Sequence, residues 1–198
     1  MPIINNLTVD VERRSVLKRL GLKYPQEVNS QHLDSLIDSE IENARRLIEP
    51  KGIYEKFAII NDGSGIIRMV GGFTIISKKL AAWLGGSRGV FLMAVTIGSK
   101  VEEEAARLIY EGEPTRGLIA DAIGSVAVEE LAETVEKLIS REAGSSAKRR
   151  FSCGYSDWAL TDQEKILDLL GAGRIGLSVN DRCIMIPQKS ITAAIGFF

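Results

Sequence analysis

The sequence predicts an α+β domain with a mixed or antiparallel sheet, and three observations lead to this prediction. Helical and strand patterns are interspersed along the chain without strict alternation. The turn sequence Asn61-Asp62-Gly63-Ser64-Gly65 joins two strand patterns in the first half, and another pair of strand patterns lies near the end. A doubly wound parallel fold would instead alternate strand and helix regularly.

The first half is expected to begin with two helices and to continue with a hairpin. Asp10 is in position to cap a short helix that stops at Gly21. Ser30 is expected to open a longer helix, whose apolar residues recur at helical spacing on one face. Residues 53–60 and 66–70 read as the strands on either side of the glycine-containing turn.

The second half is expected to hold the central strand and the longest helix. Residues 90–97 form an apolar run without alternation, which indicates a strand buried on both faces. Gly124, inside the longest helix, predicts close approach of another element, because glycine otherwise weakens a helix. The predicted elements are helix 78–84 capped by Ser77, strand 90–97, a helix capped by Ser99, helix 116–142, a helix from Thr161 or Asp162 to about 170, and strands 175–179 and 191–198.

Length and composition indicate a single domain, residues 1–198, with an N-terminal helical segment at 1–52 and an α+β core at 53–198. Hydrophobic residues make up 45% and charged residues 26%, which is ordinary for a soluble globular protein. A net charge of −1 gives no basic field for nucleic acid. No signal peptide or membrane span is visible, so a cytoplasmic protein with reduced thiols is expected.

Several residue types that could carry chemistry favour structural roles. Cys153 and Cys183 are the only cysteines and His32 is the only histidine, which argues against a zinc site or a Ser-His-Asp triad. The glycine turn at 61–65 leads into a strand rather than a helix, so a hairpin is favoured over a phosphate loop. The carboxylates Glu102-Glu103-Glu104 lie in the first turn of a helix, where they complement its dipole.

The segment from Arg150 to Tyr155 is the strongest candidate for a ligand site. Arginine binds a carboxylate through two parallel hydrogen bonds, and a tyrosine ring attracts a cation. Gly154 between them permits backbone conformations and close approaches that other residues forbid. Such partners suit an amino acid that carries a cationic sulfonium. A structural salt bridge by Arg150 and a core position for Tyr155 are the alternative.

The long helix before this segment carries three glutamates on one face. Glu129, Glu133 and Glu136 are spaced at i, i+4 and i+7. A solvated face is the simplest interpretation of this pattern. Glu133 stands apart, because it lies beside the most apolar stripe of the helix in Leu131-Ala132-Glu133.

An ordered set of motifs resembles the S-adenosylmethionine-binding activation domain of vitamin B12-dependent methionine synthase, in its free-standing, single-domain branch. The set comprises Arg150-x-x-x-Gly154-Tyr155, Trp158, Leu160 to Gln163, and Met185-x-Pro187-x-x-Ser190, with upstream likeness at 94–98 and 121–125. It covers residues 90–198 well and the first half loosely. The resemblance implies a curved α+β domain with a twisted, mainly antiparallel sheet flanked by helices.

The resemblance also implies a set of ligand contacts. Arg150 and Tyr155 would contact S-adenosylmethionine, together with Gly154 between them. Glu133 is the position that lines up with a glutamate of the family's site, and the backbone at Ser156 and Asp157 would flank the adenosine. Cys153 departs from the pattern, because the family usually has proline there.

The implied function is the reactivation of a methionine synthase that lacks its own activation domain. The chain would bind the methyl donor and present it to cob(II)alamin carried by a partner subunit, for reductive methylation. It would be inactive alone, as one component of a methyltransferase in methionine biosynthesis. A cobalamin-binding methionine synthase subunit is the expected partner, and a flavodoxin-like electron donor is a further candidate. The alternatives are a non-catalytic docking module for a corrinoid protein that has lost the donor site, and a sensor or enzyme for another carboxylate ligand.

Overall fold

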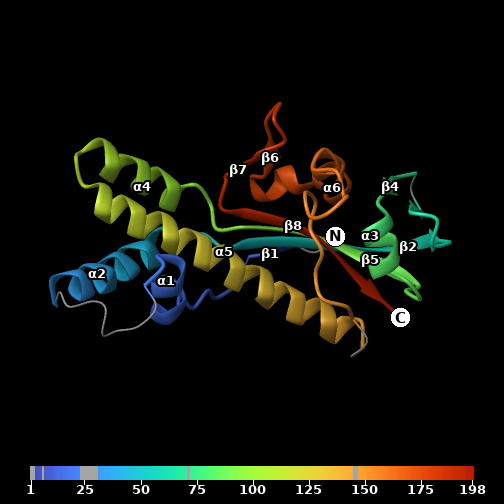
Figure 1. Cartoon of the computed structure of the whole chain (residues 1–198), viewed down its shortest axis with the longest axis horizontal. Coiled ribbons are helices and arrows are strands. Elements are labelled where there is room, and N and C mark those ends of the chain that lie inside the picture. The colour runs from blue at the N-terminus through green and yellow to red at the C-terminus, as the bar shows by residue number, and fades with distance from the viewer. Residues whose placement is uncertain (1–2, 6, 23–30, 71, 145–146) are drawn as a thin grey trace.

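The computed structural model describes residues 3–5, 7–22, 31–70, 72–144 and 147–198 (Figure 1). Its helices and strands follow one another in this order: β1 Ile3–Ile4, α1 Arg13–Arg19, α2 Gln31–Leu47, β2 Lys51–Asn61, β3 Ile66–Met69, β4 Thr74–Ile76, α3 Lys78–Trp83, β5 Gly89–Thr96, α4 Lys100–Tyr110, α5 Pro114–Glu142, α6 Asp162–Leu170, the 3-10 helix η1 Ala172–Ile175, β6 Ser178–Val179, β7 Met185–Ile186 and β8 Ser190–Phe197.

The main sheet is antiparallel at every pairing of its described strands, in the order β4-β3-β2-β5-β8. The long strand β2 pairs with β1 near its start and with β3 at its end, so these two short strands share one side of β2. A separate two-stranded sheet joins β6 to β7. The sheet is a curled half-barrel with helices around it, which confirms the predicted α+β class with an antiparallel sheet.

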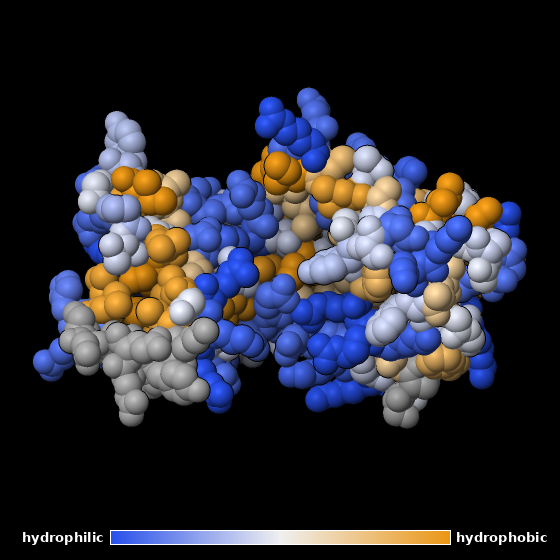
Figure 2. All heavy atoms as spheres, in the orientation of Figure 1, coloured by the Kyte–Doolittle hydropathy of each residue, from blue (hydrophilic) through white to orange (hydrophobic). Residues whose placement is uncertain are grey.

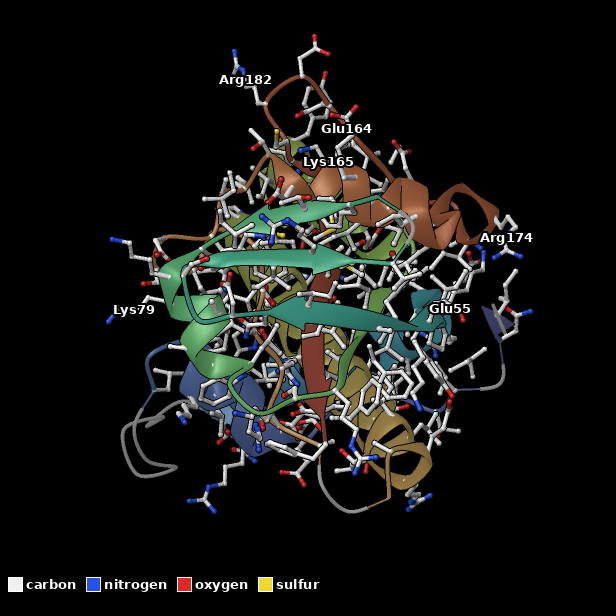
Figure 3. The ribbon with its side chains drawn as sticks, turned by 90° about the vertical axis from the view of Figure 1, so that its right-hand side faces the viewer. Glu55, Lys79, Glu164, Lys165, Arg174 and Arg182 are labelled. Atoms are coloured by element: carbon white, nitrogen blue, oxygen red, sulfur yellow. The ribbon has the colours of Figure 1, made fainter. Side chains whose placement is uncertain are left out.

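Two hydrophobic cores lie on opposite faces of this sheet. The first core packs α1, α2 and α5 against odd-numbered residues of β5 and β8. The second packs α3, α6 and η1 against even-numbered residues of the same strands. Turned by 90°, the structure shows α6 on one side of the sheet and α5 on the other (Figure 3). Because successive side chains of a strand point to opposite faces, β5 supplies both cores and is buried along its whole length.

The strongest sequence patterns give the expected elements. The apolar run predicted at 90–97 is β5, the long helix predicted at 116–142 is α5, and Asn61 and Asp62 close the β2–β3 hairpin by accepting hydrogen bonds from the amides of Gly63 and Ser64. Ser77 caps α3 as predicted, accepting a 2.9 Å hydrogen bond from the amide of Leu80.

Gly124 also behaves as predicted. A Cβ atom at this position would lie 3.1 Å from Val101 and 3.2 Å from Lys189, so the glycine lets α4 and the residue before β8 approach α5 closely. Lys189 is held there by Asp121, at 2.6 Å, and by the Ser125 hydroxyl, at 2.9 Å.

Some predicted boundaries are wrong. Helix α1 follows Glu12 with no side-chain cap, so Asp10 does not cap it. Ser99 and Thr161 precede α4 and α6 without side-chain cap bonds. Of the strand predicted at 175–179, Ile175 ends η1, Gly176 lies in a turn, and only Ser178–Val179 is a strand, which pairs with β7.

The N-terminal part of the chain contributes to the main sheet. The division predicted after residue 52 falls inside β2, and the N-terminal segment contributes β1 as well as helices. Ser30, predicted to open α2, lies outside the described residues.

The surface is mostly hydrophilic in the view of Figure 1, with apolar side chains gathered over the α4–α5 end and near β7 (Figure 2). The exposed large hydrophobic residues include Ile109 and Tyr110 of α4, Leu118 of α5, and Ile184 and Ile186 before and in β7. Within the described ranges, we find no helix both long enough and apolar enough to cross a membrane.

Candidate functional site

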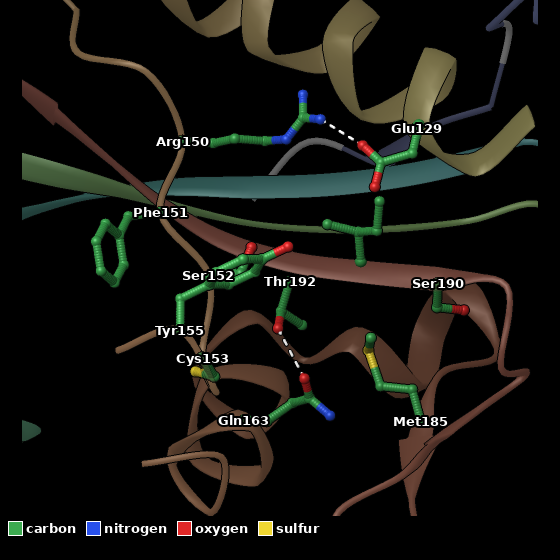
Figure 4. A pocket seen from close by; sticks show the side chains of 11 residues that line it. Glu129, Arg150, Phe151, Ser152, Cys153, Tyr155, Gln163, Met185, Ser190 and Thr192 are labelled. Carbon is green, nitrogen blue, oxygen red and sulfur yellow. Dashed lines mark hydrogen bonds and ion pairs between the residues drawn. The ribbon is translucent and has the colours of Figure 1, made fainter. Parts of the chain in front are cut away.

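A cleft of about 300 Å³ lies at the outer edge of β8, where the two helical layers meet (Figure 4). Its walls come from α5, the segment 150–155, α6, β7 and β8, through Glu129, Arg150, Phe151, Ser152, Cys153, Tyr155, Gln163, Met185, Ser190, Ile191 and Thr192. The volume is at the lower end of the range for small-molecule sites. The cleft therefore contains Arg150 and Tyr155, which the sequence predicted as ligand contacts.

Arg150 reaches the cleft because its segment lies along the edge of β8. Phe151 and Ala194 exchange backbone hydrogen bonds of 2.9 and 2.8 Å, and the amide of Lys148 donates to the carbonyl of Gly196 at 2.9 Å. Adjacent side chains of an extended segment point to opposite sides. Phe151 accordingly packs near Trp158 in the second core, and Arg150 points toward α5.

The Arg150 guanidinium is held by two carboxylates of α5. Its Nη2 lies 2.5 Å from Glu129 and its Nη1 lies 2.9 Å from Glu136, and its side chain is only 16% exposed. Glu136 also accepts a hydrogen bond from the backbone amide of Arg150, at 3.1 Å, and lies 3.3 Å from Nε of Arg149. The structure thus contains the salt bridge that the sequence left open as an alternative, and it places this salt bridge in the cleft wall.

Glu133 lies between these two glutamates in the sequence but does not line the cleft. It is half-buried. Burial of Glu130, and after it the negative charge of Glu133, raises the pKa of Glu130 on α5. Glu129 is the α5 glutamate that lines the cleft beside Arg150.

The turn after Arg150 presents the Tyr155 ring at the cleft. Gly154 has a φ of +82°, a conformation that glycine adopts readily, and its amide donates to the Trp158 carbonyl at 2.9 Å. Ser156 follows in the left-handed region with a φ of +57°. Trp158 anchors the turn in the core and donates from its indole nitrogen to Asp162 at 3.1 Å. Tyr155 is 67% exposed and stands edge-on to Phe151.

The Asp157 carboxylate forms its hydrogen bonds outside the cleft. Its carboxylate accepts hydrogen bonds from the Ser77 hydroxyl, at 2.5 Å, and from the amides of Lys78 and Lys79, at 2.8 and 3.2 Å. These bonds lower the pKa of Asp157, the Ser77 hydroxyl having the largest effect. Asp157 and Ser156 are both exposed and do not line the cleft, so their predicted backbone contact with an adenosine stays a prediction.

The floor of the cleft is polar and its groups are paired. The Thr192 hydroxyl and the Gln163 carboxamide oxygen are 3.1 Å apart, and the Gln163 nitrogen donates to the Cys183 carbonyl at 2.9 Å. The Ser190 hydroxyl lies 2.7 Å from the Pro187 carbonyl and 2.9 Å from the Thr96 hydroxyl.

Sequence reasoning did not assign these floor residues to the site. Gln163, Met185 and Ser190 entered only as parts of the motif set, and Thr192 not at all. A signal was present in Ser190-Ile191-Thr192, where hydroxyl side chains take alternate positions of an otherwise apolar strand.

Cys153 lines the cleft with a buried thiol. Burial, helped by the nearby charge of Asp162, raises the pKa of its thiol to about 12. The reactive thiolate form is therefore scarce at neutral pH. Among the described residues, no group of three or more His, Cys, Asp or Glu side chains is placed to hold a metal ion.

A curled antiparallel sheet with helices on both faces and a cleft at its edge defines a class of α+β domain distinct from doubly wound nucleotide-binding folds. Within this class, the chain has the fold of the MetH reactivation domain, whose crystal structure was determined bound to AdoHcy. The likeness has a TM-score of 0.69 and covers 99% of this chain and 78% of that chain, at 13% sequence identity. No protein-family model and no curated protein matches the sequence. The resemblance inferred from the motif set is thus confirmed at the level of the fold.

Proposed function

We propose that this chain binds S-adenosylmethionine in the cleft at the edge of β8 and serves as the reactivation subunit of a cobalamin-dependent methionine synthase that lacks its own activation domain. The observation that carries the proposal is the pairing of a fixed guanidinium with an exposed phenol ring in one cleft, in a fold shared with a domain that binds AdoHcy. Arg150 would hold the ligand's carboxylate, and Tyr155 would offer its ring to the sulfonium.

The chain's task would be orientation rather than acid or base catalysis. Cobalamin on the partner would supply the metal centre that accepts the methyl group. The residues of this chain would hold the donor's sulfur so that the methyl group faces that centre. The buried and protonated Cys153 suits this role, because it offers no competing nucleophile beside the donor.

Apolar side chains near the cleft support docking of a partner there. Tyr155 lines the cleft, Ile184 and Ile186 flank the lining residue Met185, and all three are well exposed. Exposed apolar groups beside a small-molecule cleft are a feature of surfaces that a partner covers. The cobalamin-binding subunit is the partner that we propose, with a flavodoxin-like protein as the electron donor.

The binding claim is tested by calorimetric titration of the chain with S-adenosylmethionine and with AdoHcy. We expect binding by the wild type and a loss of affinity of at least about tenfold in Arg150→Ala, because a charge-assisted pair is removed. Arg149→Ala is the matched control, since Arg149 adjoins Arg150, is 76% exposed and does not line the cleft. No heat from the wild type, alone or with the cobalamin-binding subunit present, would refute the claim.

One observation favours the alternative of a docking module without a donor site: both sides of the Arg150 guanidinium are already occupied by glutamates. In that case a pull-down would capture the cobalamin-binding subunit while no methyl transfer from S-adenosylmethionine occurs. Methyl transfer that depends on Arg150 would exclude this alternative.

A further inference from the structure

The two residues proposed to bind the ligand are held at the cleft in different ways. Arg150 is fixed through its side chain and its backbone, since two glutamates hold the guanidinium and the neighbouring Phe151 pairs with β8. Tyr155 has less support. It is 67% exposed, and its one ring contact among the described residues is with Phe151, at 6.5 Å between ring centroids. The position of the Tyr155 ring therefore depends on the backbone of its turn.

The turn that carries Tyr155 has a conformation that its sequence does not favour. The Gly154 amide donates to the Trp158 carbonyl at 2.9 Å, but the two other backbone bonds of the turn, from Tyr155 to Ser152 and from Trp158 to Tyr155, are longer, at 3.3 and 3.2 Å. Ser156, directly after Tyr155, has a φ of +57°, a left-handed conformation that residues with a side chain adopt only rarely. Such a conformation persists only where its surroundings hold it.

Asp157, the residue after Ser156, ties this turn to α3. Its carboxylate accepts hydrogen bonds from the Ser77 hydroxyl and from the first two amides of α3. Hydrogen bonds to an ionised carboxylate are stronger than those between neutral groups. Helix α3 is itself fixed, because its buried side chains belong to the second core. Asp157 therefore joins the strained position 156 to a rigid element of the fold.

We infer that Asp157 is a positioning residue, whose carboxylate keeps Ser156 in the left-handed conformation and thereby holds the Tyr155 ring at the cleft. Asp157 lies outside the cleft and acts on the ligand through Tyr155, not through Arg150, which has its own supports. This inference rests on the proposed function and deepens it, because it extends the determinants of ligand affinity to the contact between the turn and α3.

Double-mutant cycles read out by calorimetric titration with AdoHcy test this route. Asp157→Ala should weaken binding by about three- to tenfold, because the ligand must then order the turn. In a Tyr155→Ala background Asp157→Ala should have no further effect, whereas in an Arg150→Ala background it should weaken binding by its full factor. Lys79→Ala is the matched control, because its side chain is exposed on the same helix and its amide still donates to Asp157 (Figure 3).

A second measurement follows the Tyr155 ring without ligand. In protein labelled with fluorotyrosine, fluorine NMR should give a signal for each of the four tyrosines, and Tyr155→Phe identifies that of Tyr155. We expect Asp157→Ala to broaden or split this signal and Lys79→Ala to leave it unchanged. Asp157→Ala should still fold, because Ser77 caps α3 through the Leu80 amide. Thermal unfolding verifies this, and Asp157→Asn, which keeps one acceptor oxygen, is the milder second variant.

The outcomes separate the inference from the proposed function. If Asp157→Ala leaves AdoHcy affinity or the Tyr155 signal unchanged, the inference is overturned while the proposed function stands. The same holds if Asp157→Ala weakens binding by an equal factor with and without the Tyr155 side chain, because Asp157 would then act by another route. If AdoHcy does not bind the wild type, the proposed function fails and the inference falls with it.

Discussion

The two faces of strands β5 and β8 differ in a way that locates the site. The face toward α5 is apolar throughout, with Phe91, Met93, Val95, Ala193, Ile195 and Phe197 in the first core. The face toward α6 changes along its length. Val90, Leu92, Ala94 and Ala194 are apolar and belong to the second core, whereas Thr96, Ser190 and Thr192 at the other end are buried and polar.

Burying a hydroxyl is unfavourable unless it is hydrogen-bonded. The three hydroxyl groups meet this requirement through the pairs Ser190–Thr96 and Thr192–Gln163. A strand pair built only for stability would have no need of them. The polar end of this face borders the cleft and forms its floor. The residues named above on the other face belong to the packed first core.

The largest effect is expected on the packing face. Phe91 is fully buried and its ring lies 5.2 Å from that of Phe197. Phe91→Ala should lower the free energy of unfolding by about 3–5 kcal/mol, since it removes a large core side chain and leaves a cavity. Urea denaturation measures this, with the exposed Leu118→Ala on α5 as a control expected within about 0.5 kcal/mol of the wild type. A cost below about 1 kcal/mol would contradict tight packing of this face.

On the cleft face, Cys153 should be nearly inert. With a pKa raised to about 12, its thiol is almost wholly protonated at about pH 8, and alkylation by iodoacetamide should be roughly a thousandfold slower than for an ordinary cysteine. Mass spectrometry of the alkylated peptides gives the rate, and the same residue in urea-unfolded protein is the reference. Equal rates in the folded and unfolded protein would show that the cleft leaves the thiol open to solvent.

A smaller effect is expected from the polar floor. Thr192→Val keeps the side-chain shape but leaves the Gln163 carboxamide oxygen without its donor, which should cost about 1–2 kcal/mol of unfolding free energy. A double-mutant cycle with Gln163→Leu measures the coupling between the two side chains. If the two losses of unfolding free energy are additive, the coupling energy between Thr192 and Gln163 is zero. The polar face would then differ from the packing face in composition only.

The parts of the fold that the sequence predicted are those with strong local patterns. The unbroken apolar run of β5 and the long apolar stripe of α5 leave few alternatives. The region 175–179 has an apolar start but lies among glycines, and Gly176 adopts a φ of +83° at the end of η1. The conformation there depends on the packing of η1 in the second core, and the local sequence pattern does not indicate that packing.

The candidate site could be predicted only as far as the segment 150–155. Arg150, Gly154 and Tyr155 lie close together in the sequence, so their motif was visible. Which glutamate of α5 contacts Arg150 depends on where the segment 148–151, which lies along β8, passes the helix. Glu129, Glu133 and Glu136 all fit the helical spacing of one face, so the sequence does not distinguish them. Arg150 contacts Glu129 and Glu136 because the backbone pairing of Phe151 with Ala194 fixes where the Arg150 segment passes α5.

The smallest effect is expected at Asp157, which ties the turn beside the cleft to α3 on the same side of the sheet. Its pKa is lowered by the hydrogen bonds it accepts, first of all from Ser77. A carboxylate whose folded-state pKa is depressed stabilises the fold fully above its ordinary pKa, and that stabilisation is lost as the pH falls through the folded-state value. Asp157→Asn keeps one acceptor oxygen but removes the charge, so it should lower the melting temperature modestly at neutral pH.

The pH dependence separates this contact from a general loss of packing. As the pH is lowered stepwise from neutral into the acid range, the difference in melting temperature between the wild type and Asp157→Asn should shrink, because the wild type then loses the same charge. A difference that stays constant through the acid range would mean that the carboxylate's charge contributes nothing. The α6 side of the sheet would then depend on core packing alone, as the α5 side does, and the contrast between the two faces would be confined to the polar floor of the cleft.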